Sequence, residues 1–188
     1  MSSPSPSPSP PVLALLNGPP GVGKSTLADA LARRHPDLRA LDVDVVKHDL
    51  DSWPSDPRGA GLRARELILD QARVELGAGR GVIIGQYLAR PEFPAALAEL
   101  AERESARFTH VLLELPVADL ERRLRDRRRS PTRPEQATND ARVEPAQAEQ
   151  LIASLEALTR AADHVLRIDA SGDLASTLSR LERAVLAR

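Results

Sequence analysis

The segment GPPGVGKST, residues 18–26, constrains the fold of this chain more than any other part of its sequence. It has the spacing G-x-x-x-x-G-K-[ST], in which glycines let a loop curl closely around a polyanion. The apolar run at Val12–Asn17 precedes the loop, and the helical pattern of Lys24–His35 follows it and ends at Pro36. A loop between a strand and a helix points backbone amides and the helix N-terminus at the same spot. The segment therefore predicts a binding site for nucleotide phosphates.

Each residue type in this loop has a chemical role. Lys24 is expected to reach the β- and γ-phosphates, the Ser25 hydroxyl to bind Mg²⁺, and Thr26 to touch the α-phosphate. Only two of the 26 basic residues are lysines, so a lysine at this position is informative. The alternative is a glycine-rich turn that matches by accident. The predicted cofactors are ATP and Mg²⁺, and the predicted cofactor-binding residues are Gly18, Gly21, Val22, Gly23, Lys24, Ser25 and Thr26.

Short apolar runs alternate with longer helical patterns along the rest of the chain. Strands are predicted at 12–17, 40–43, 81–85, 110–115 and 164–168. Helices are predicted at 24–35, 62–76, 91–103, 116–129, 147–161 and 174–187. This alternation is typical of an α/β fold with a parallel sheet between two helix layers. We expect one domain over residues 12–188, after a disordered Ser-Pro tail at 1–11.

Composition excludes several classes of function. The chain contains no cysteine, so it has no disulfide, thiolate metal site or cysteine nucleophile. Its formal net charge is −1, which favours neither nucleic acid nor an acidic membrane as partner. Its apolar run near the N-terminus is too short to span a bilayer. We expect a cytoplasmic protein whose partner is a small molecule, and the oligomeric state stays open.

The second predicted strand ends in LDVDVVKHD, a segment rich in carboxylates. Asp42 and Asp44 would share one side of that strand at its carboxyl end, where ligands of open α/β sheets bind. Asp44 could accept the proton of an acceptor hydroxyl or hold a water of Mg²⁺, and the alternative is a helix cap. Lys47 would line the acceptor pocket or belong to a solvated face. Trp53, the only tryptophan, would stack on an acceptor ring or anchor its loop.

An arginine-rich segment carries seven arginines between Arg122 and Arg133. Arg123 and Arg127 lie four residues apart beside the apolar stripe of the predicted helix, so they are the two candidates for stabilising charge on a transferring phosphoryl group. The proline-containing stretch at about 128–146 is predicted to be a lid over the nucleotide. The alternative is a solvated arginine-rich face. An RNA-binding patch lacks the interleaved aromatic residues that would support it.

Taken together, these motifs resemble the small P-loop kinases of the nucleoside-monophosphate-kinase fold. The nearer relatives are the shikimate and gluconate kinases, chloramphenicol phosphotransferase, tunicamycin-resistance proteins and zeta-toxin-like kinases. The resemblance is good from Val12 to about Arg129 and loose beyond. It implies a five-stranded parallel sheet in the order 2-3-1-4-5 with a lid. It also implies Asp44 as general base and Arg123 and Arg127 as lid-entry arginines.

The same resemblance implies further contacts around the substrates. Gln86, Tyr87 and Arg90, in VIIGQYLAR, would face the acceptor, and the segment RIDASG at 167–172 would pack against adenine. With Asp42 and Lys47, which the end of the second predicted strand already placed on the acceptor side, they are the predicted substrate-binding residues. Gly85-Gln86 stands where many P-loop proteins have an acidic residue at the end of the third strand. Magnesium would then rely on Ser25, phosphates, water and Asp44.

Three functions are compatible with the sequence. The first is an ATP-dependent kinase that transfers the γ-phosphoryl group to a hydroxyl of a metabolite or antibiotic. The second is a nucleotide-binding ATPase or switch module, although the chain has no N-K-x-D motif for reading guanine. The third is a zeta-toxin-like kinase that acts on a nucleotide sugar. The sequence does not identify the acceptor.

Overall fold

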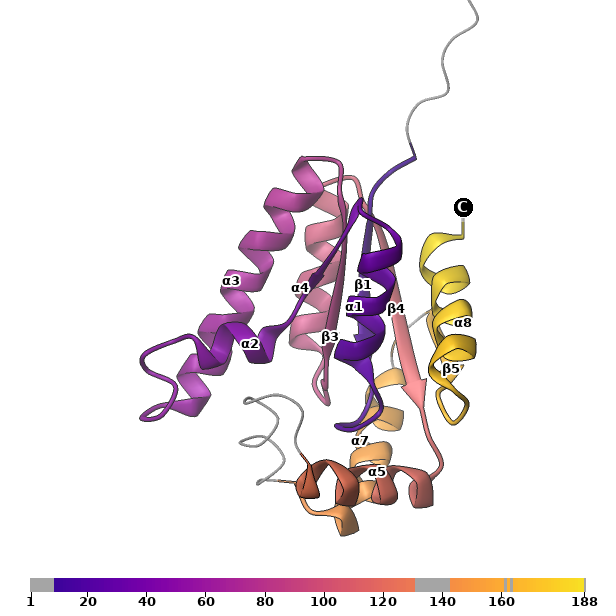
Figure 1. Cartoon of the computed structure of the whole chain (residues 1–188). Helices are drawn as coiled ribbons and strands as arrows, with labels where there is room; N and C mark the ends of the chain where they lie inside the picture. Colours follow the sequence, from indigo (N-terminus) through magenta and orange to yellow (C-terminus); the bar gives the residue numbers. More distant parts are fainter. Residues whose placement is uncertain (1–8, 131–142, 161, 163, 188) are drawn as a thin grey trace, which may run out of the picture.

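Five parallel strands form a single sheet in the order β2-β3-β1-β4-β5 (Figure 1). The computed structural model describes residues 9–130, 143–160, 162 and 164–187. The strands are β1 (Val12–Asn17), β2 (Leu38–Leu41), β3 (Gly81–Gln86), β4 (Arg107–Glu114) and β5 (Val165–Asp169). The expected order 2-3-1-4-5 is confirmed, and β1 with its following loop lies in the middle of the sheet.

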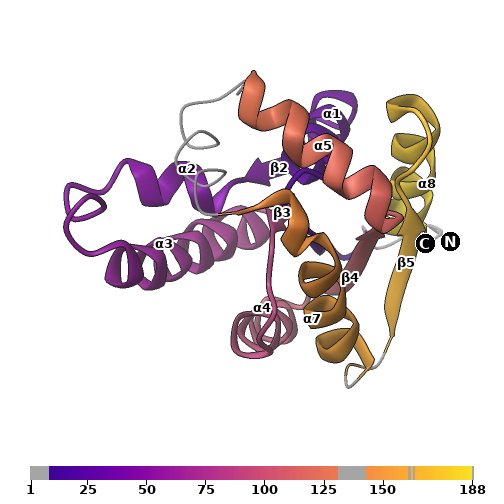
Figure 2. The ribbon, with the colours of Figure 1, turned by 90° about the horizontal axis from the view of Figure 1, so that it is seen from below.

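Helices cover both faces of this sheet (Figure 2). One face carries α1 (Lys24–Arg34) and α8 (Leu174–Leu186), and the other carries α3 (Pro57–Gly77), α4 (Glu92–Arg103) and α7 (Ala148–Arg160). Beyond the carboxyl ends of the strands lies α5 (Val117–Arg129). Two short helices complete the described elements, α2 (Val43–His48) and the 3₁₀ helix η1 (Pro145–Gln147). The predicted α/β architecture with helices on both faces is confirmed.

The central strand β1 is buried on both faces and contributes to two hydrophobic cores. All six of its residues are buried. Because successive side chains of a strand point to opposite faces, Ala14 and Leu16 pack with α1 and α8, whereas Leu13 and Leu15 pack with α3 and α4. A strand buried on both faces needs a continuous apolar sequence rather than an alternating one, and VLALL supplies it.

The second strand differs from the sequence prediction. It covers Leu38–Leu41 rather than 40–43, and α2 begins at Val43. The placement of Asp42 and Asp44 on one side of a strand is therefore wrong. The physical reason is capping: the Asp42 carboxylate accepts hydrogen bonds from the backbone N–H groups of Asp44 (2.9 Å) and Val45 (3.4 Å), which starts a helix where the sequence pattern predicts a strand.

Helix α3 and strand β4 begin earlier in the chain than predicted. Helix α3 begins at Pro57 rather than at residue 62, because the Asp56 carboxylate caps it by accepting from the Gly59 N–H at 2.9 Å. Strand β4 begins at Arg107 rather than at residue 110, because the Arg107 N–H donates to the Pro11 carbonyl at 2.8 Å and extends the pairing with β1. The remaining predicted helices and strands agree with the structure to within two residues at each end.

The two segments predicted to lack regular structure are only partly described. The core of the predicted lid, residues 131–142, and residues 1–8 of the Ser-Pro tail lie outside the described residues. At the borders of the lid segment, the Arg128 guanidinium at the end of α5 donates a hydrogen bond to the Glu144 carboxylate, so its two ends lie close together. Among the helices that are described, none is both long enough and apolar enough to cross a membrane.

Candidate active site

The loop after β1 adopts the conformation that its glycines predict. Gly23 forms the N-cap of α1 with φ of 108°, a left-handed angle that side-chain-bearing residues rarely adopt. The loop is held at its start by Asn17, whose side-chain oxygen accepts from the N–H groups of Gly18 (2.8 Å) and Leu88 (3.0 Å). Its amide nitrogen donates to the Leu88 carbonyl at 3.1 Å. Asn17 thus ties the phosphate loop to the segment after β3.

Lys24 lies folded into this loop. Its ammonium group donates hydrogen bonds to the carbonyls of Gly18 and Pro19, both at 2.9 Å. Burial is the main cause that lowers the pKa of Lys24 from 10.5 to about 8; Asp44 opposes the shift, Arg127 adds to it, and Asp42 opposes it less. Asp44 and Arg127 therefore both lie within electrostatic range of the lysine that the motif assigns to the phosphates.

The Ser25 hydroxyl lies next to a carboxylate. It donates a hydrogen bond to Asp42 Oδ2 at 2.9 Å, while Asp42 Oδ1 caps α2. A hydroxyl and a carboxylate at this spacing are the hard oxygen ligands that Mg²⁺ prefers, and the ion usually keeps water and phosphate oxygens as its other ligands. The described residues contain no cluster of three acidic or histidine ligands, so a magnesium ion here would need such additional oxygens. The donor set fits a magnesium ion that arrives with a nucleotide.

The end of β3 lies close to the start of α1. A Cβ built on Gly85 would lie 3.2 Å from Lys24 Cβ and 3.4 Å from the Lys24 carbonyl carbon. Because that contact is tighter than nine in ten real Cβ contacts, a side chain at residue 85 would require Lys24 to shift by a few tenths of an ångström. The carboxylate beside Ser25 comes from Asp42 and not from the end of β3.

A second group of side chains surrounds α2. Asp44, in the first turn of this helix, lies 3.2 Å from the Lys47 ammonium group. Lys47 in turn lies 4.2 Å from the ring centroid of Trp53, and the His48 ring lies 4.6 Å from the same tryptophan. Trp53 is only 8% exposed, so it anchors the loop after α2 against these two side chains. This group of residues is the acceptor-side cluster: Asp44, Lys47, His48 and Trp53.

The three residues predicted after β3 are placed differently from one another. Gln86 is partly buried at the end of the strand. The Tyr87 hydroxyl is hydrogen-bonded to Ser154 Oγ of α7 at 2.9 Å, so it joins the β3 exit to that helix. Arg90 is exposed in the turn before α4. The contact of these residues with an acceptor stays a prediction.

The two predicted arginines of α5 lie beside the phosphate loop but do different things. Arg123 donates to the carbonyls of Val22 (3.1 Å) and Ala170 (2.8 Å), so it clamps the loop to the segment after β5. Arg127 lies next to Gly21, since a Cβ built on that glycine would lie 3.8 Å from Arg127 Cδ. Of the two, Arg127 is the one whose positive charge helps to lower the pKa of Lys24. The structure thus gives Arg123 a role in holding backbone, whereas Arg127 lies among the charged groups of the site.

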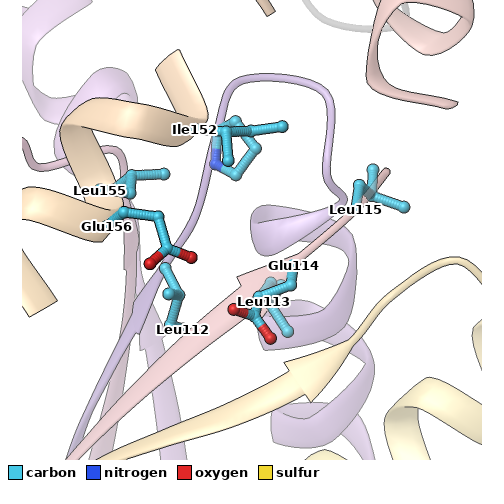
Figure 3. A pocket seen from close by; sticks show the side chains of 8 residues that line it. Leu112, Leu113, Glu114, Leu115, Ile152, Leu155 and Glu156 are labelled. Atoms are coloured by element: carbon cyan, nitrogen blue, oxygen red, sulfur yellow. The ribbon is translucent and has the colours of Figure 1, made fainter. Parts of the chain in front are cut away.

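A small cavity lies beside the loop on the α7 side (Figure 3). Its volume is about 130 Å³, which is below the size of ordinary ligand pockets. Pro19, Leu112, Leu115, Ile152 and Leu155 give it an apolar lining. The carboxylates of Glu114 and Glu156 at its border both pair with Arg167 of β5. The cavity is too small to hold a nucleotide.

Most of the predicted site therefore gathers at the carboxyl edge of the sheet. Lys24, Ser25, Asp42, Asp44 and Arg127 meet there, drawn from α1, the β2–α2 junction and α5. A glycine-rich loop in the middle of a parallel sheet, with a lysine, a hydroxyl and a carboxylate around it, defines a nucleotide-binding P-loop protein with a kinase-like fold.

The comparisons agree with this class. Residues 13–158 match the AAA domain family, so the chain belongs to that family. None of the curated protein sequences matches the chain.

Solved structures share the fold over nearly the whole length. A sugar kinase from Janibacter sp. HTCC2649 is 18% identical, with a TM-score of 0.64 over 93% of this chain and 94% of that one. A gluconokinase from Sinorhizobium meliloti 1021 is 17% identical, with a TM-score of 0.58 over 92% and 93%. A shikimate kinase from Bacteroides thetaiotaomicron is 23% identical, with a TM-score of 0.57 over 92% and 97%. At these identities the likeness is one of fold.

Proposed function

We propose that this chain is an ATP-dependent kinase that transfers the γ-phosphoryl group of ATP to a hydroxyl of a small molecule. The observation that carries the proposal is the arrangement around Lys24. The ammonium of this lysine lies in the phosphate loop, and the carboxylate of Asp44 lies within electrostatic range of it. A phosphoryl group held by Lys24 would thus be close to a base on the acceptor side.

Each residue around the phosphate loop has its own role in the proposed reaction. Without nucleotide, Lys24 donates its hydrogen bonds to the carbonyls of Gly18 and Pro19, and we expect phosphate oxygens to take over these bonds. Mg²⁺, held by Ser25 and Asp42, would supply positive charge to the phosphates when it is bound. Arg127 of α5 would add positive charge beside the loop as the phosphoryl group moves.

Asp44 is the candidate for proton transfer. As the acceptor oxygen forms its bond to the γ-phosphorus, the bond from that phosphorus to the oxygen shared with the β-phosphate breaks, and ADP leaves. The proton of the acceptor hydroxyl moves to the Asp44 carboxylate. Lys47, 3.2 Å from that carboxylate and stacked on Trp53, holds it in place.

The test is a screen for acceptor-dependent ADP release. Purified protein is incubated with MgATP and a panel of sugars, sugar acids, polyols, nucleotide sugars and aminocyclitol antibiotics, with Lys24→Ala as the inactive control. A kinase releases ADP only with its acceptor, whereas an ATPase or switch module releases ADP and inorganic phosphate without any.

Once an acceptor is known, Asp44→Asn tests the base. We expect MgATP binding to be unchanged and transfer to slow by at least about 10²-fold. Transfer by Asp44→Asn near the wild-type rate would refute Asp44 as the base, and ADP release that no acceptor stimulates would refute the kinase itself.

A further inference from the structure

A hollow lies at the amino edge of the sheet, at the opposite end of the strands from the phosphate loop (Figure 1). Its floor is formed by the first residues of four neighbouring strands, Leu38, Gly81, Val12 and Arg107. Because β1 spans six residues, this edge lies roughly 20 Å from the loop that follows the strand. The amino-edge hollow is therefore separate from the nucleotide side and from the acceptor side.

The amino-edge hollow has the size of a ligand site and largely apolar walls. Its volume is about 580 Å³, within the range of about 300–1,000 Å³ that small-molecule sites occupy. Pro10, Pro11 and Pro36 border it, together with Leu186 at the end of α8. Proline carries no backbone N–H, so these walls offer apolar surface without hydrogen-bond donors. A molecule bound here would rest an apolar body against them.

Arg107 brings a positive charge to the floor of the hollow. Its side chain is partly buried, and its guanidinium donates to the Thr109 hydroxyl at 2.8 Å and to the Val185 carbonyl near the end of α8. Both acceptors are neutral. In the described part of the chain no carboxylate pairs with this guanidinium, and three of its five N–H donors have no partner. A cation partly withdrawn from water without a counter-ion favours the arrival of an anion.

Two other ionisable side chains border the hollow, and neither changes this preference. The His35 ring at the end of α1 lies 2.7 Å from the Glu182 carboxylate of α8, so its acidic partner already comes from the protein. Asp37 is exposed before β2, and two strands separate β2 from β4, which puts it roughly 14 Å from the Arg107 backbone. Water and salt screen an exposed carboxylate at this distance. Arg107 therefore sets the charge that the hollow prefers.

We propose that the amino-edge hollow binds a small organic acid, with its carboxylate on Arg107 and its apolar body against Val12, Leu38 and the prolines. A bond from a guanidinium to a carboxylate is charge-assisted and directional. One guanidinium matches the single charge of a carboxylate better than the higher charge of a phosphate ester. This site is independent of the proposed kinase reaction, since none of its residues belongs to the phosphate loop or to the acceptor-side cluster.

Titration calorimetry with three probes tests the proposed ligand class. Benzoate carries a carboxylate on an apolar ring, benzyl alcohol keeps the ring without the charge, and acetate keeps the charge without the ring. We expect benzoate to bind at a single site and more tightly than either, by roughly 10–10²-fold over benzyl alcohol, the usual effect of a hydrogen bond to a charged group. Equal affinities for benzoate and benzyl alcohol would overturn the proposal.

Competition with nucleotide tells the amino-edge hollow from the candidate active site. Saturating MgADP should leave the affinity for benzoate unchanged, because the two sites lie at opposite edges of the sheet. Displacement of benzoate by MgADP would place the probe at the phosphate loop and contradict the proposal.

Variants of the floor and the rim locate the bound acid. Arg107→Met should lower the affinity for benzoate by roughly 10–10²-fold, whereas Arg107→Lys keeps the charge and should retain most of it. Arg103→Met, at the exposed end of α4 outside the hollow, is the matched control and should bind benzoate as the wild type does.

Arg107 also ties β4 to α8, so urea unfolding must show that each variant is folded. Ala187→Trp provides a second test that leaves Arg107 in place, because a large side chain at this exposed rim position fills the hollow and should weaken benzoate binding. Wild-type affinity for benzoate in folded Arg107→Met or in Ala187→Trp would show that the acid binds elsewhere, and the site would be wrong.

Discussion

Replacing Lys24 by methionine should stabilise the protein when no nucleotide is bound. The lysine is buried in the loop, and its pKa is lowered from 10.5 to about 8. The folded protein therefore releases this proton more easily than the unfolded chain does. A shift of 2.5 pH units corresponds to about 3 kcal/mol of lost stability at pH 7, where both states carry the proton. Methionine has a similar length and no charge to bury.

The stability difference between the wild type and Lys24→Met should depend on pH. Between pH 8 and pH 10.5 the unfolded chain binds the proton and the folded protein does not, so wild-type stability rises with pH in this window. The advantage of Lys24→Met should accordingly shrink from about 3 kcal/mol at pH 7 to about 1 kcal/mol at pH 9.5. Lys24→Arg, which keeps a charge that does not titrate, should show no such recovery.

Urea unfolding at pH 7 and pH 9.5, with and without MgADP, measures the effect. Nucleotide should reverse the ranking, because MgADP stabilises the wild type through Lys24 and stabilises Lys24→Met much less. A nucleotide-free Lys24→Met protein that is no more stable than wild type at pH 7 would refute the reasoning. It would mean that the two carbonyl hydrogen bonds of the lysine fully offset the cost of its burial.

Two further predictions concern stability away from Lys24. Burial lowers the pKa of His110 from 6.5 to about 4, so the wild type should lose up to about 3 kcal/mol between pH 6.5 and pH 4, where only the unfolded chain takes up the proton. His110→Leu should remove that slope in acid unfolding curves, and a slope that persists would point to another group. Asn17→Leu leaves the N–H groups of Gly18 and Leu88 without their acceptor, so it should cost about 2–4 kcal/mol in thermal unfolding and weaken MgADP binding. Unchanged MgADP binding would show that the loop keeps its shape without Asn17.

The sequence predicted the centre of the fold well because several signals coincide there. A continuous apolar run, a loop with three glycines and a helix that ends before Pro36 are mutually consistent over residues 12–36. The order of the strands came from the resemblance, because contacts between strands far apart in the chain leave no trace in spacing. Helix α3 was predicted too short because its buried stripe is mostly alanine, with Ala60, Ala64 and Ala72, while Leu62 is 55% exposed. Hydrophobic periodicity gives little weight to alanine.

The site was predicted less completely, since partners chosen by the fold are invisible in one sequence. The contact of Arg123 with the phosphoryl group stays a prediction, and one sequence could not show that its nitrogens bind the carbonyls of Val22 and Ala170, residues 101 and 47 positions away. Asn17 went unnoticed, although a buried polar residue between an apolar run and Gly18 was a usable signal.

The error at Asp42 and Asp44 leads to the most useful view of the site. Had both residues stood on a strand, their carboxylates would have been independent neighbours. Instead one carboxylate does two things: Asp42 Oδ2 accepts from Ser25, and Oδ1 accepts from the N–H of Asp44 and caps α2. The helix turn that carries the candidate base is therefore fixed by the same group that faces the candidate metal ligand. Any shift of Asp42 toward a cation at Ser25 must act on the cap of α2, so the nucleotide side and the acceptor side of this site are joined through a single side chain.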